Sequence, residues 1–280
     1  MTSEQAVHFV IRAGREDAQR LALDAGALFG AAGWSVTESL LDDDRNEPDS
    51  IPHDVDTVIA FGGDGTFLEA VRIAHPRGAR VGGINLGRLG YLAGFEAAEA
   101  EDLFDRVLND PTSVTERTMV EATACLADQG NAKVFYALNE ISLEKTDPGH
   151  VTRLRVAVNE VDFATYSADG IIVATPTGST AYALSARGPI VSPNVNCLIF
   201  VPVAPHMLFD RAMVFADSDC IAFTAERDTV VTADGRNLVR MSPGDALTCR
   251  IAEHPLTVFE PERDFHQVLR RKFNLVELEC

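Results

Sequence analysis

The sequence has few cysteines, and their arrangement argues against two kinds of stabilised domain. It holds five, at positions 125, 197, 220, 249 and 280. The number is odd and no two form a CxxC pair, so neither a disulfide framework nor a zinc site is supported. The histidines show no metal-ligand spacing either. We therefore expect reduced thiols and a cytoplasmic protein.

Long apolar runs and positive charge are also lacking. No stretch reaches the roughly 18 apolar residues of a transmembrane helix, and residues 1–5 lack the features of a secretory signal. The 24 Lys and Arg residues against 42 Asp and Glu give a formal net charge of −18. Such a chain repels nucleic acid and anionic membranes, so we expect neither as a partner. An anionic ligand would need local positive groups, from helix N-termini, a few Lys or Arg side chains, or bound Mg²⁺.

Apolar residues make up 46% of the 280 residues, which is enough for a large core and for two domains. Residues 1–110 alternate between strand and helix patterns, which predicts a doubly wound α/β domain with a parallel sheet. The expected strands lie at 7–11, 34–37, 56–61 and 80–85, and the expected helices at 16–31, 67–74 and 99–108. Residues 41–52 are polar and acidic and predict a loop.

Short apolar runs separated by turns follow over residues 111–262, and they predict a β-rich, sandwich-like domain. Expected strands lie at 119–126, 133–138, 154–158, 171–174, 197–203, 220–224, 230–233, 246–251 and 256–259. Asn159-Glu160 and Asp234-Gly235 predict hairpin turns. Residues 264–273 predict a helix with basic residues near its end, and we expect residues 263–280 to return to the first domain.

The strongest functional signal is the segment Gly62-Gly63-Asp64-Gly65-Thr66. It follows a predicted buried strand and precedes a helix, an arrangement that brings backbone N–H groups close to phosphate. The central acid is unusual there, because a carboxylate repels phosphate. Asp64 is therefore a candidate base for a hydroxyl proton, or a magnesium ligand. The alternative is a tight turn in which Asp64 caps the helix.

Three further segments place polar groups beside predicted strands. Residues 85–90 follow the strand at 80–85, and parallel sheets bind ligands at the carboxyl ends of their strands. Residues 175–182 offer many hydroxyls and no charge, which suits a base and a sugar. A Ser/Thr-rich turn that caps a helix near Thr180 explains them equally well. Asn139-Glu140 has the groups to bind ribose hydroxyls, but taken alone a polar strand end is the better interpretation.

In this order, the four segments resemble those of NAD kinases. The resemblance runs from about residue 56 to 275 and includes residues 201–206 and 268–273. GGDGT is shared with diacylglycerol, sphingosine and phosphofructokinases, whereas residues 175–182 are far more specific. The resemblance implies phosphoryl transfer to the adenosine 2′-hydroxyl of NAD, giving NADP. It also implies ATP or polyphosphate as the donor, with Mg²⁺ or another divalent metal, and a homodimer or homotetramer.

The resemblance also implies roles for single residues. Asp64 would be the catalytic base, Asn139 and Glu140 would contact the adenosine, and Asp169 would bind the nicotinamide end. The full set of implied NAD-binding positions is Asp64, Gly65, Asn139, Glu140, Asp169, Thr177, Thr180, Ala181, Tyr182, Ser185 and Ala204. The implied donor-phosphate positions are Gly62, Gly63, Gly65 and Thr66.

Two positions depart from the family pattern. Glu69 stands where many members carry Arg or Lys, and a carboxylate there would repel phosphate. Arg187 stands where a glycine is usual, and we hypothesise that it supplies part of the missing positive charge. Glu69 favours one alternative, an idle NAD(P)-binding regulator. The other alternative is a lipid kinase of the same superfamily, which the lack of a membrane-binding stretch opposes.

Two features receive no firm role from the sequence. Asp234 is equally well a second carboxylate near the site or part of a plain hairpin turn. The basic run at 270–272 is better explained as a helix C-terminus than as a ligand site.

Overall fold

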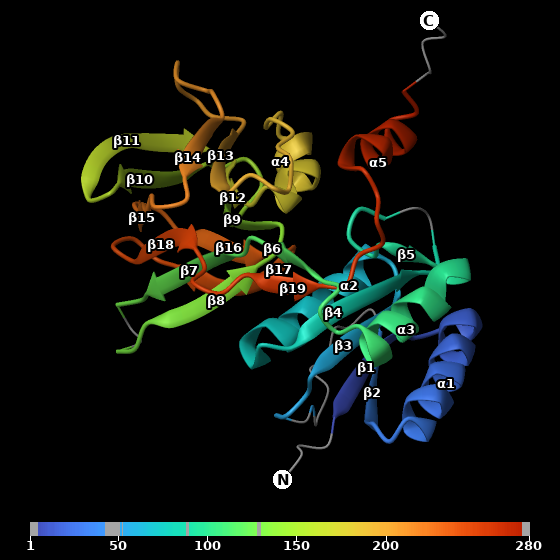
Figure 1. Ribbon diagram of the computed structural model, residues 1–280. Coiled ribbons are helices and arrows are strands. Elements are labelled where there is room, and N and C mark those ends of the chain that lie inside the picture. The colour runs from blue at the N-terminus through green and yellow to red at the C-terminus, as the bar shows by residue number, and fades with distance from the viewer. Residues whose placement is uncertain (1–4, 43–50, 52, 88–89, 128–129, 276–280) are drawn as a thin grey trace, which may run out of the picture. The chain divides into compact units, whose positions relative to one another are not determined.

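The computed structural model describes residues 5–42, 51, 53–87, 90–127 and 130–275 (Figure 1). The chain forms two compact units, which we call unit 1 (residues 1–116 and 256–280) and unit 2 (residues 117–255). These divisions follow Glu116 and Pro255, whereas the sequence placed them after residues 110 and 262. Within the described residues, no helix is both long and apolar enough to cross a bilayer.

Unit 1 is built on a parallel sheet whose first strands have the order β2-β1-β3-β4. Their bounds are Ser35–Leu41, Ala6–Arg12, Thr57–Gly62 and Arg80–Asn85. The order continues with β19 (Leu256–Val258) and β6 (Thr115–Arg117), and β5 (Phe95–Glu96) pairs with β4. Every residue of β3 is buried, as expected for an inner strand covered on both faces. The predicted α/β domain is confirmed, and most of the loop predicted at 41–52 lies outside the described residues.

Two adjacent glycines of β4 show that helices cover both faces of this sheet. A Cβ atom on Gly82 would lie 2.7 Å from Leu103 of α3 (Ala100–Asn109). One on Gly83 would collide with Phe67 of α2 (Asp64–Ala74). Because successive residues of a strand point to opposite faces, α3 and α2 lie on opposite sides of the sheet, as Figure 1 shows.

The remaining long helix of unit 1, α1 (Glu16–Ala31), packs on the same face as α3. Phe29 of α1 stands edge-on to Phe9 of β1 and to Phe104 of α3, with ring centroids 5.9 and 6.0 Å apart. The C-terminal helix α5 (Phe265–Lys272) begins at an N-cap, Asp264, whose side chain accepts the backbone N–H groups of two residues in its first turn.

The described residues of unit 2 form two six-stranded antiparallel sheets. The first has the order β11-β10-β15-β18-β7-β8, with bounds Val161–Ala168, Thr152–Val158, Ile221–Ala225, Ala246–Ile251, Val120–Cys125 and Lys133–Ala137. The second has the order β14-β13-β12-β9-β16-β17, with bounds Met213–Ala216, Cys197–Val203, Gly170–Ala174, Glu140–Lys145, Thr229–Ala233 and Arg236–Met241. The predicted β-rich domain is confirmed.

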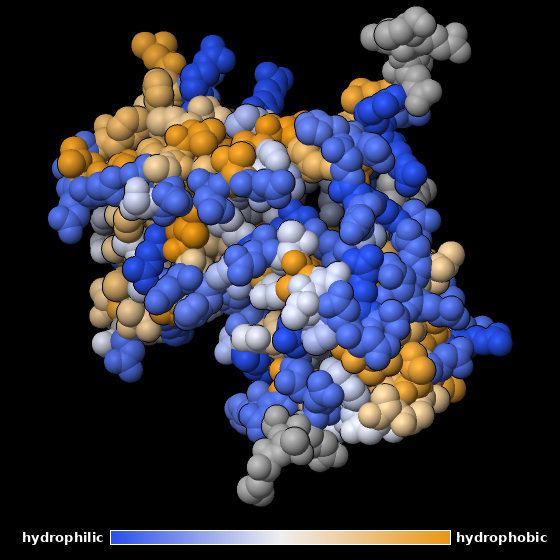
Figure 2. All heavy atoms as spheres, viewed as in Figure 1, coloured by the Kyte–Doolittle hydropathy of each residue, from blue (hydrophilic) through white to orange (hydrophobic). Residues whose placement is uncertain are grey.

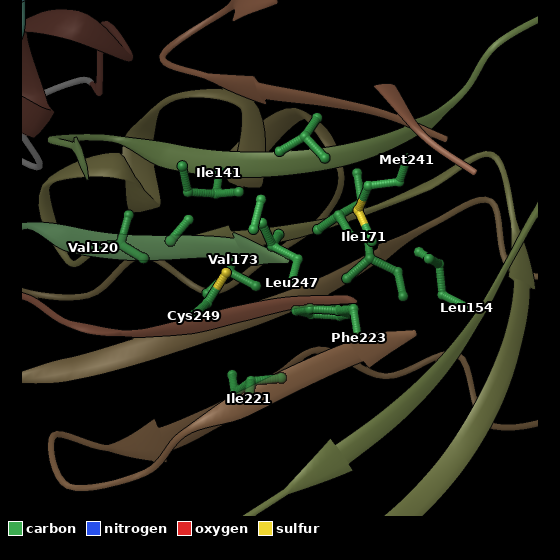
Figure 3. Packing of buried hydrophobic residues seen from close by; sticks show 14 of the residues in the cluster. Val120, Ile141, Leu154, Ile171, Val173, Ile221, Phe223, Met241, Leu247 and Cys249 are labelled. Atoms are coloured by element: carbon green, nitrogen blue, oxygen red, sulfur yellow. The ribbon is translucent and has the colours of Figure 1, made fainter. Parts of the chain in front are cut away.

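One apolar core is shared by these two sheets (Figure 3). It includes Val120 and Leu247 from the first sheet and Ile141 and Ile171 from the second. Strand β12 is buried on both faces. Ile171 points into the core between the sheets, whereas the following residue, Ile172, packs on the opposite face against the short helix α4 (Tyr182–Ser185). This double burial explains the unbroken apolar run that leads into residues 175–182.

Both predicted hairpin turns are confirmed. Asn159 and Glu160 have φ angles of 49° and 67°, and Asp234 and Gly235 have φ angles of 47° and 75°. Two successive positive φ values are typical of the type I′ turn that matches the twist of a hairpin. The helix expected near Thr180 is smaller than a full helix: a 3₁₀ turn, η3 (Thr177–Thr180), precedes α4.

Candidate active site

Asp64 is the first residue of α2, but its side chain does not cap that helix. Gly63 is the N-cap residue, and no side-chain capping bond is formed. The Asp64 carboxylate instead accepts backbone N–H groups from three successive residues of the loop after β4. Tyr91 donates to Oδ2 at 2.9 Å, and Leu92 and Ala93 donate to Oδ1 at 3.1 and 3.4 Å. The interpretation of Asp64 as a helix cap is therefore wrong.

The three N–H donors leave the carboxylate with unused capacity. A carboxylate has about four acceptor sites, and among the described residues Asp64 uses two on Oδ1 and one on Oδ2. The remaining site on Oδ2 can accept a hydroxyl proton or contribute to a metal ion. Because the other three bonds come from the backbone, the position of this oxygen does not depend on a mobile side chain.

Glycines around Asp64 make close approaches possible. A Cβ atom on Gly90 would overlap Asp64 Oδ1, so a larger residue there would push the carboxylate away. In contrast, no atom of the described residues lies within 4 Å of the Cβ positions of Gly63 and Gly65. The chain is therefore open on those two sides, as the approach of a phosphate to the backbone requires. Thr66 is buried with its side chain against Gly62, and its predicted contact with phosphate stays a prediction.

Glu69 is paired with a cation of its own helix. The Nε atom of Arg72 lies 3.1 Å from each carboxylate oxygen of Glu69, and the two side chains form an ion pair. Only 11% of the Glu69 side chain is exposed. The Arg72 charge therefore compensates the carboxylate that the sequence presented as a source of repulsion.

In unit 2, Asp234 organises the start of β9. Its carboxylate accepts the backbone N–H groups of Leu138, Asn139 and Glu140 at 2.9, 2.8 and 3.1 Å. The backbone N–H of Asp234 in turn donates to the carbonyl of Glu140 at 3.0 Å. The two interpretations of Asp234 from the sequence therefore hold together: Asp234 is a hairpin residue, and its carboxylate lies beside Asn139 and Glu140 of the predicted site. The dipeptide Asp-Gly predicted the turn, but nothing in the sequence predicted the three backbone donors to the Asp234 carboxylate.

The two acids of this region have strongly shifted pKa values. Burial raises the pKa of Asp234 to about 6, although its three backbone hydrogen bonds oppose the rise. Burial also raises the pKa of Glu140 to about 8, and the charge of Asp234 adds to this shift. Within the described part of the chain, Glu140 Oε2 and Asn139 Oδ1 are buried and have no hydrogen-bond partner. Buried acceptors without donors are costly, so these two atoms favour a ligand that brings donor groups.

Residues 175–182 are fastened to the same strand start. The backbone N–H of Thr175 donates to the Asn139 carbonyl at 2.9 Å, and its hydroxyl donates to the Leu138 carbonyl. A Cβ atom on Gly178 would overlap the backbone of Asn139, so only glycine allows this packing. The segments 138–140 and 175–182, predicted separately, therefore meet around Asp234.

Several hydroxyls of this segment serve the loop itself. Ser179 is buried and bonds both the N–H and the carbonyl of Val191, at 3.1 and 3.2 Å. The Thr180 hydroxyl donates to the carbonyl of Thr177 at 3.3 Å. The interpretation as a Ser/Thr-rich turn thus holds for part of the segment, whereas Tyr182 keeps 37% of its surface exposed.

The other predicted positions lie around this loop. Asp169 forms an ion pair of 2.7 Å with Lys145, a residue that the sequence did not single out. Burial, followed by the charges of Glu144, Asp169 and Glu140, raises the pKa of Tyr182, so acidic groups surround this hydroxyl. Lys145 and Glu144 escaped notice because only the pairing of β9 with β12 brings them there. Ser185 and Ala204 are exposed, and Ala204 has a φ angle of 44°.

Comparison with known proteins connects both regions to one family. Residues 15–112 match the model of the ATP-NAD kinase N-terminal domain, and residues 138–260 match that of the ATP-NAD kinase C-terminal domain. The chain belongs to the NAD kinase family. The NAD kinase of Symbiobacterium thermophilum is 39% identical over 227 residues, which cover 79% of each chain. The NAD kinase of Syntrophotalea carbinolica is 36% identical over 80% of this chain and 79% of its own.

Two solved structures of NAD or NADH kinases share this fold. Yeast NADH kinase complexed with NADH aligns with a TM-score of 0.85 at 21% identity, over 100% of this chain and 91% of its own. An NAD kinase from Archaeoglobus fulgidus in complex with ATP aligns with a TM-score of 0.75 at 25% identity, over 97% and 100%. The NAD kinase fold therefore extends over essentially the whole chain.

Proposed function

We propose that this chain phosphorylates the adenosine 2′-hydroxyl of NAD, with ATP as the donor, to give NADP and ADP. One observation carries the proposal: Asp64 is held by three backbone N–H groups, retains an acceptor site on Oδ2, and lies beside the open Gly63 and Gly65. Membership of the NAD kinase family supports it, as do relatives named NAD kinase and the structure of one in complex with ATP.

In the proposed reaction, Asp64 acts as the base. The oxygen of the 2′-hydroxyl bonds to the γ-phosphorus of ATP, the bond from that phosphorus to the leaving ADP breaks, and the hydroxyl proton passes to Asp64 Oδ2. Phosphoryl transfer depends mainly on positioning and electrostatics, and a carboxylate fixed by the backbone needs no rearrangement during the reaction. The first turn of α2 adds backbone N–H groups and the positive end of a helix dipole for the donor phosphates, near Gly62, Gly63, Gly65 and Thr66.

A divalent metal fits this arrangement. Among the described residues no group of three His, Cys, Asp or Glu side chains could hold a metal. Mg²⁺ is usually bound by one or two carboxylates together with substrate phosphates and water, so Asp64 and a bound donor would suffice. When bound, Mg²⁺ would neutralise charge on the donor phosphates.

Unit 2 would recognise NAD. The unpartnered acceptors Glu140 Oε2 and Asn139 Oδ1 match the hydroxyl and amino donors of adenosine. Asp169 would bind the nicotinamide end. Further contacts are proposed for the residues that surround the loop, namely Thr177, Thr180, Ala181, Tyr182, Ser185 and Ala204.

No observation now favours an idle regulator or a lipid kinase. Glu69 was the feature that argued for an idle regulator, and its carboxylate is paired with Arg72. The segment 175–182, which argued against a lipid kinase, packs directly on Asn139 and so forms part of the proposed NAD site.

The direct test is the formation of NADP by the purified protein from NAD, ATP and Mg²⁺. Parallel reactions replace ATP by polyphosphate, replace NAD by NADH, or omit the metal with a chelator. NADP formation that requires ATP and Mg²⁺ is expected. If neither ATP nor polyphosphate gives NADP, the proposed function is wrong. If only polyphosphate does, the acceptor assignment stands and the donor assignment is wrong.

Arg187 remains a candidate for the positive charge that the site needs. It follows α4 with a φ of 66°, a left-handed conformation that favours glycine, and its side chain is exposed. We expect Arg187→Gly to stabilise the fold by about 1 kcal/mol, because this conformation is strained for other residues. If Arg187→Ala leaves the KM for NAD and the KM for ATP unchanged, Arg187 supplies no charge to the site.

We further propose a homodimer or homotetramer assembled through unit 2. Figure 2 shows apolar side chains on the surface over β11 and β14. The exposed residues there are Val161, Phe163, Leu208, Phe209 and Val214, and Phe163 stands edge-on to Phe209 with ring centroids 6.0 Å apart. Light scattering after gel filtration should give two or four times the chain mass, and Phe209→Asp should lower it. A monomeric wild type would contradict the proposal.

A further inference from the structure

Helix α5 brings an ammonium group to the loop that holds Asp64. The Nζ atom of Lys272, the last residue of α5, lies 3.5 Å from the centroid of the Tyr91 ring. The backbone N–H of the same Tyr91 donates to Asp64 Oδ2. Lys272 and the proposed base are therefore linked through one residue, although 208 positions separate them (272 − 64).

The chain before α5 is attached to the rest of unit 1. The guanidinium of Arg263 pairs with Glu99, and Arg106 of α3 donates to the carbonyl of Glu260 at 3.2 Å. The ring of Pro261 occupies the space beside Gly94, where a Cβ atom would lie 2.8 Å from it. Helix α5 itself contains no buried residue. A contribution to the apolar core therefore does not explain why α5 lies beside Tyr91.

Among the residues that the structure describes, no carboxylate neutralises the ammonium of Lys272. Among the described residues it forms no ion pair of 4.0 Å or less and no side-chain hydrogen bond; its contact is the face of the Tyr91 ring. The Asp64 carboxylate is already bonded by three N–H groups. Burial lowers the pKa of Lys272, and the nearby charge of Asp64 partly opposes this shift. The geometry thus holds a cation near Asp64, and the N–H groups of the ammonium that face away from the Tyr91 ring are available to a ligand.

A cation in this position would reduce the repulsion between the acidic chain and an anionic phosphate donor. The formal net charge is −18, and the donor is a polyanion. Lysine is a compact point charge suited to phosphate, and the face of an aromatic ring attracts an ammonium without neutralising its charge. The ring of Tyr91 can therefore hold the Lys272 ammonium in place, while the ammonium N–H groups that face away from the ring donate to an incoming anion.

We propose that Lys272 is a further catalytic residue, whose ammonium binds the non-bridging oxygens of the phosphoryl group that is transferred. This inference rests on the proposed function. Lys272 forms and breaks no covalent bond in it: the 2′-hydroxyl proton still passes to Asp64, and ADP still leaves with the electrons of the broken bond. The lysine stabilises the charge on the phosphoryl oxygens in the transition state.

The test compares Lys272→Met, which keeps an unbranched apolar side chain over Tyr91 but removes the charge, with Lys272→Arg, which restores a cation. The matched control is Arg271→Met, which removes the exposed positive charge of the adjacent residue of α5. We expect Lys272→Met to lower kcat/KM for ATP by about 10²-fold or more, as loss of a transition-state donor does, with the KM for NAD unchanged. Lys272→Arg should recover at least tenfold of that loss, and Arg271→Met should behave as the wild type.

Three outcomes would overturn the proposal. They are wild-type kinetics in Lys272→Met, an equal loss in Arg271→Met, and an equal loss in Lys272→Arg. A second measurement separates this inference from the proposed function: titration of the wild type and of Lys272→Met with inorganic tripolyphosphate and Mg²⁺ by calorimetry. Weaker binding by tenfold or more in Lys272→Met supports the phosphate-binding role even if the wild type produces no NADP. Equal binding contradicts it, whatever the activity.

Discussion

Asp64 in unit 1 and Asp234 in unit 2 are held by the same device in different settings. Each carboxylate accepts the backbone N–H groups of three successive residues, 91–93 for Asp64 and 138–140 for Asp234. In both cases the donors come from a segment distant in the sequence. The bonds fix each carboxylate firmly, so this device alone does not distinguish a base from a structural acid.

The groups beside the two carboxylates differ in charge. Lys272 lies near Asp64, on the ring of Tyr91, and the adjacent Gly63 and Gly65 are open. Asp234 has Glu140 beside it, and each has a raised pKa, about 6 for Asp234 and about 8 for Glu140. A cation and an accessible backbone suit the first region to the binding of an anionic phosphate donor. Two acids and unpartnered acceptor oxygens prepare the second for a neutral, donor-rich ligand such as a nucleoside.

The comparison teaches that backbone hydrogen bonds set where a carboxylate stands, whereas its neighbours set what it can do. Asp64 should therefore matter for the chemical step. Asp234 should matter for binding and stability, through the segment 138–140 that it holds.

The largest expected effect is that of Asp64→Asn. Loss of a general base lowers kcat by about 10²–10⁴-fold, and we expect a fall in this range with the affinity for NAD broadly retained. Steady-state rates of NADP formation and calorimetric titration with NAD measure the two quantities. An unchanged kcat would remove Asp64 from its proposed role and would leave the two carboxylates functionally alike.

The next largest effect is expected for Gly90→Ala. The added Cβ would overlap Asp64 Oδ1, so the carboxylate must shift, and a misplacement of about 1 Å can reduce a rate about 10²-fold. The control is Gly30→Ala in α1, where no described residue has an atom within 4 Å of the new Cβ atom, and a more stable helix with unchanged kcat is expected. A normal kcat in Gly90→Ala would show that the position of Asp64 does not limit the reaction.

Much of unit 1 could be predicted from the sequence. The alternation of apolar runs and helical patterns located its inner strands, because these are buried on both faces and read as continuous apolar segments. The glycine turn around Asp64 was also visible, since its residues are consecutive. The donors to Asp64 were not, because they lie 27 to 29 residues away and contribute only backbone atoms, which carry no residue signature.

In unit 2, contacts between segments distant in the sequence were even harder to predict. Its segments 138–140 and 175–182 were singled out, but their meeting at Asp234 depends on hydrogen bonds between residues 94 to 96 positions apart. The pairing of Lys145 with Asp169 follows from the register of β9 and β12, which a single sequence does not reveal. The contact of Lys272 with Tyr91 arises from the way the C-terminal segment packs in unit 1, which local sequence patterns do not predict.

A smaller effect on kcat is expected from Asp234→Ala. This change leaves three backbone N–H groups without their acceptor, so we expect the free energy of unfolding to fall by about 2 kcal/mol and the KM for NAD to rise. Asp234→Asn is the matched control, because asparagine keeps an acceptor oxygen and tolerates the left-handed conformation, and it should be less affected. Urea unfolding and steady-state kinetics give both quantities. A fall in kcat as large as that of Asp64→Asn, with the KM unchanged, would break the distinction between the two carboxylates.

The last expected effect concerns stability and not kcat: it is a pH dependence of the free energy of unfolding due to Glu140. Its pKa of about 8 in the folded protein exceeds the ordinary value of 4.5, so the folded state holds the proton more tightly than the unfolded state. The stability that this group contributes is therefore complete below about pH 4.5 and is lost as the pH rises through 8. The buried His8, with a pKa lowered to about 4 mainly by burial, acts in the opposite direction between about pH 4 and 6.5.

The contribution of Glu140 is isolated by comparing the wild type with Glu140→Gln in urea unfolding at several pH values, since His8 is common to both proteins. The free energy of unfolding of the wild type relative to this variant should fall steadily from pH 5 to pH 8. Glu116→Gln, which removes an exposed carboxyl group of unit 1, is the control for the loss of one charge. If the difference between the wild type and Glu140→Gln does not change with pH, the pKa of Glu140 is not raised in the folded protein. The electrostatic difference between the two regions would then rest on Lys272 near Asp64 and not on the acids around Asp234.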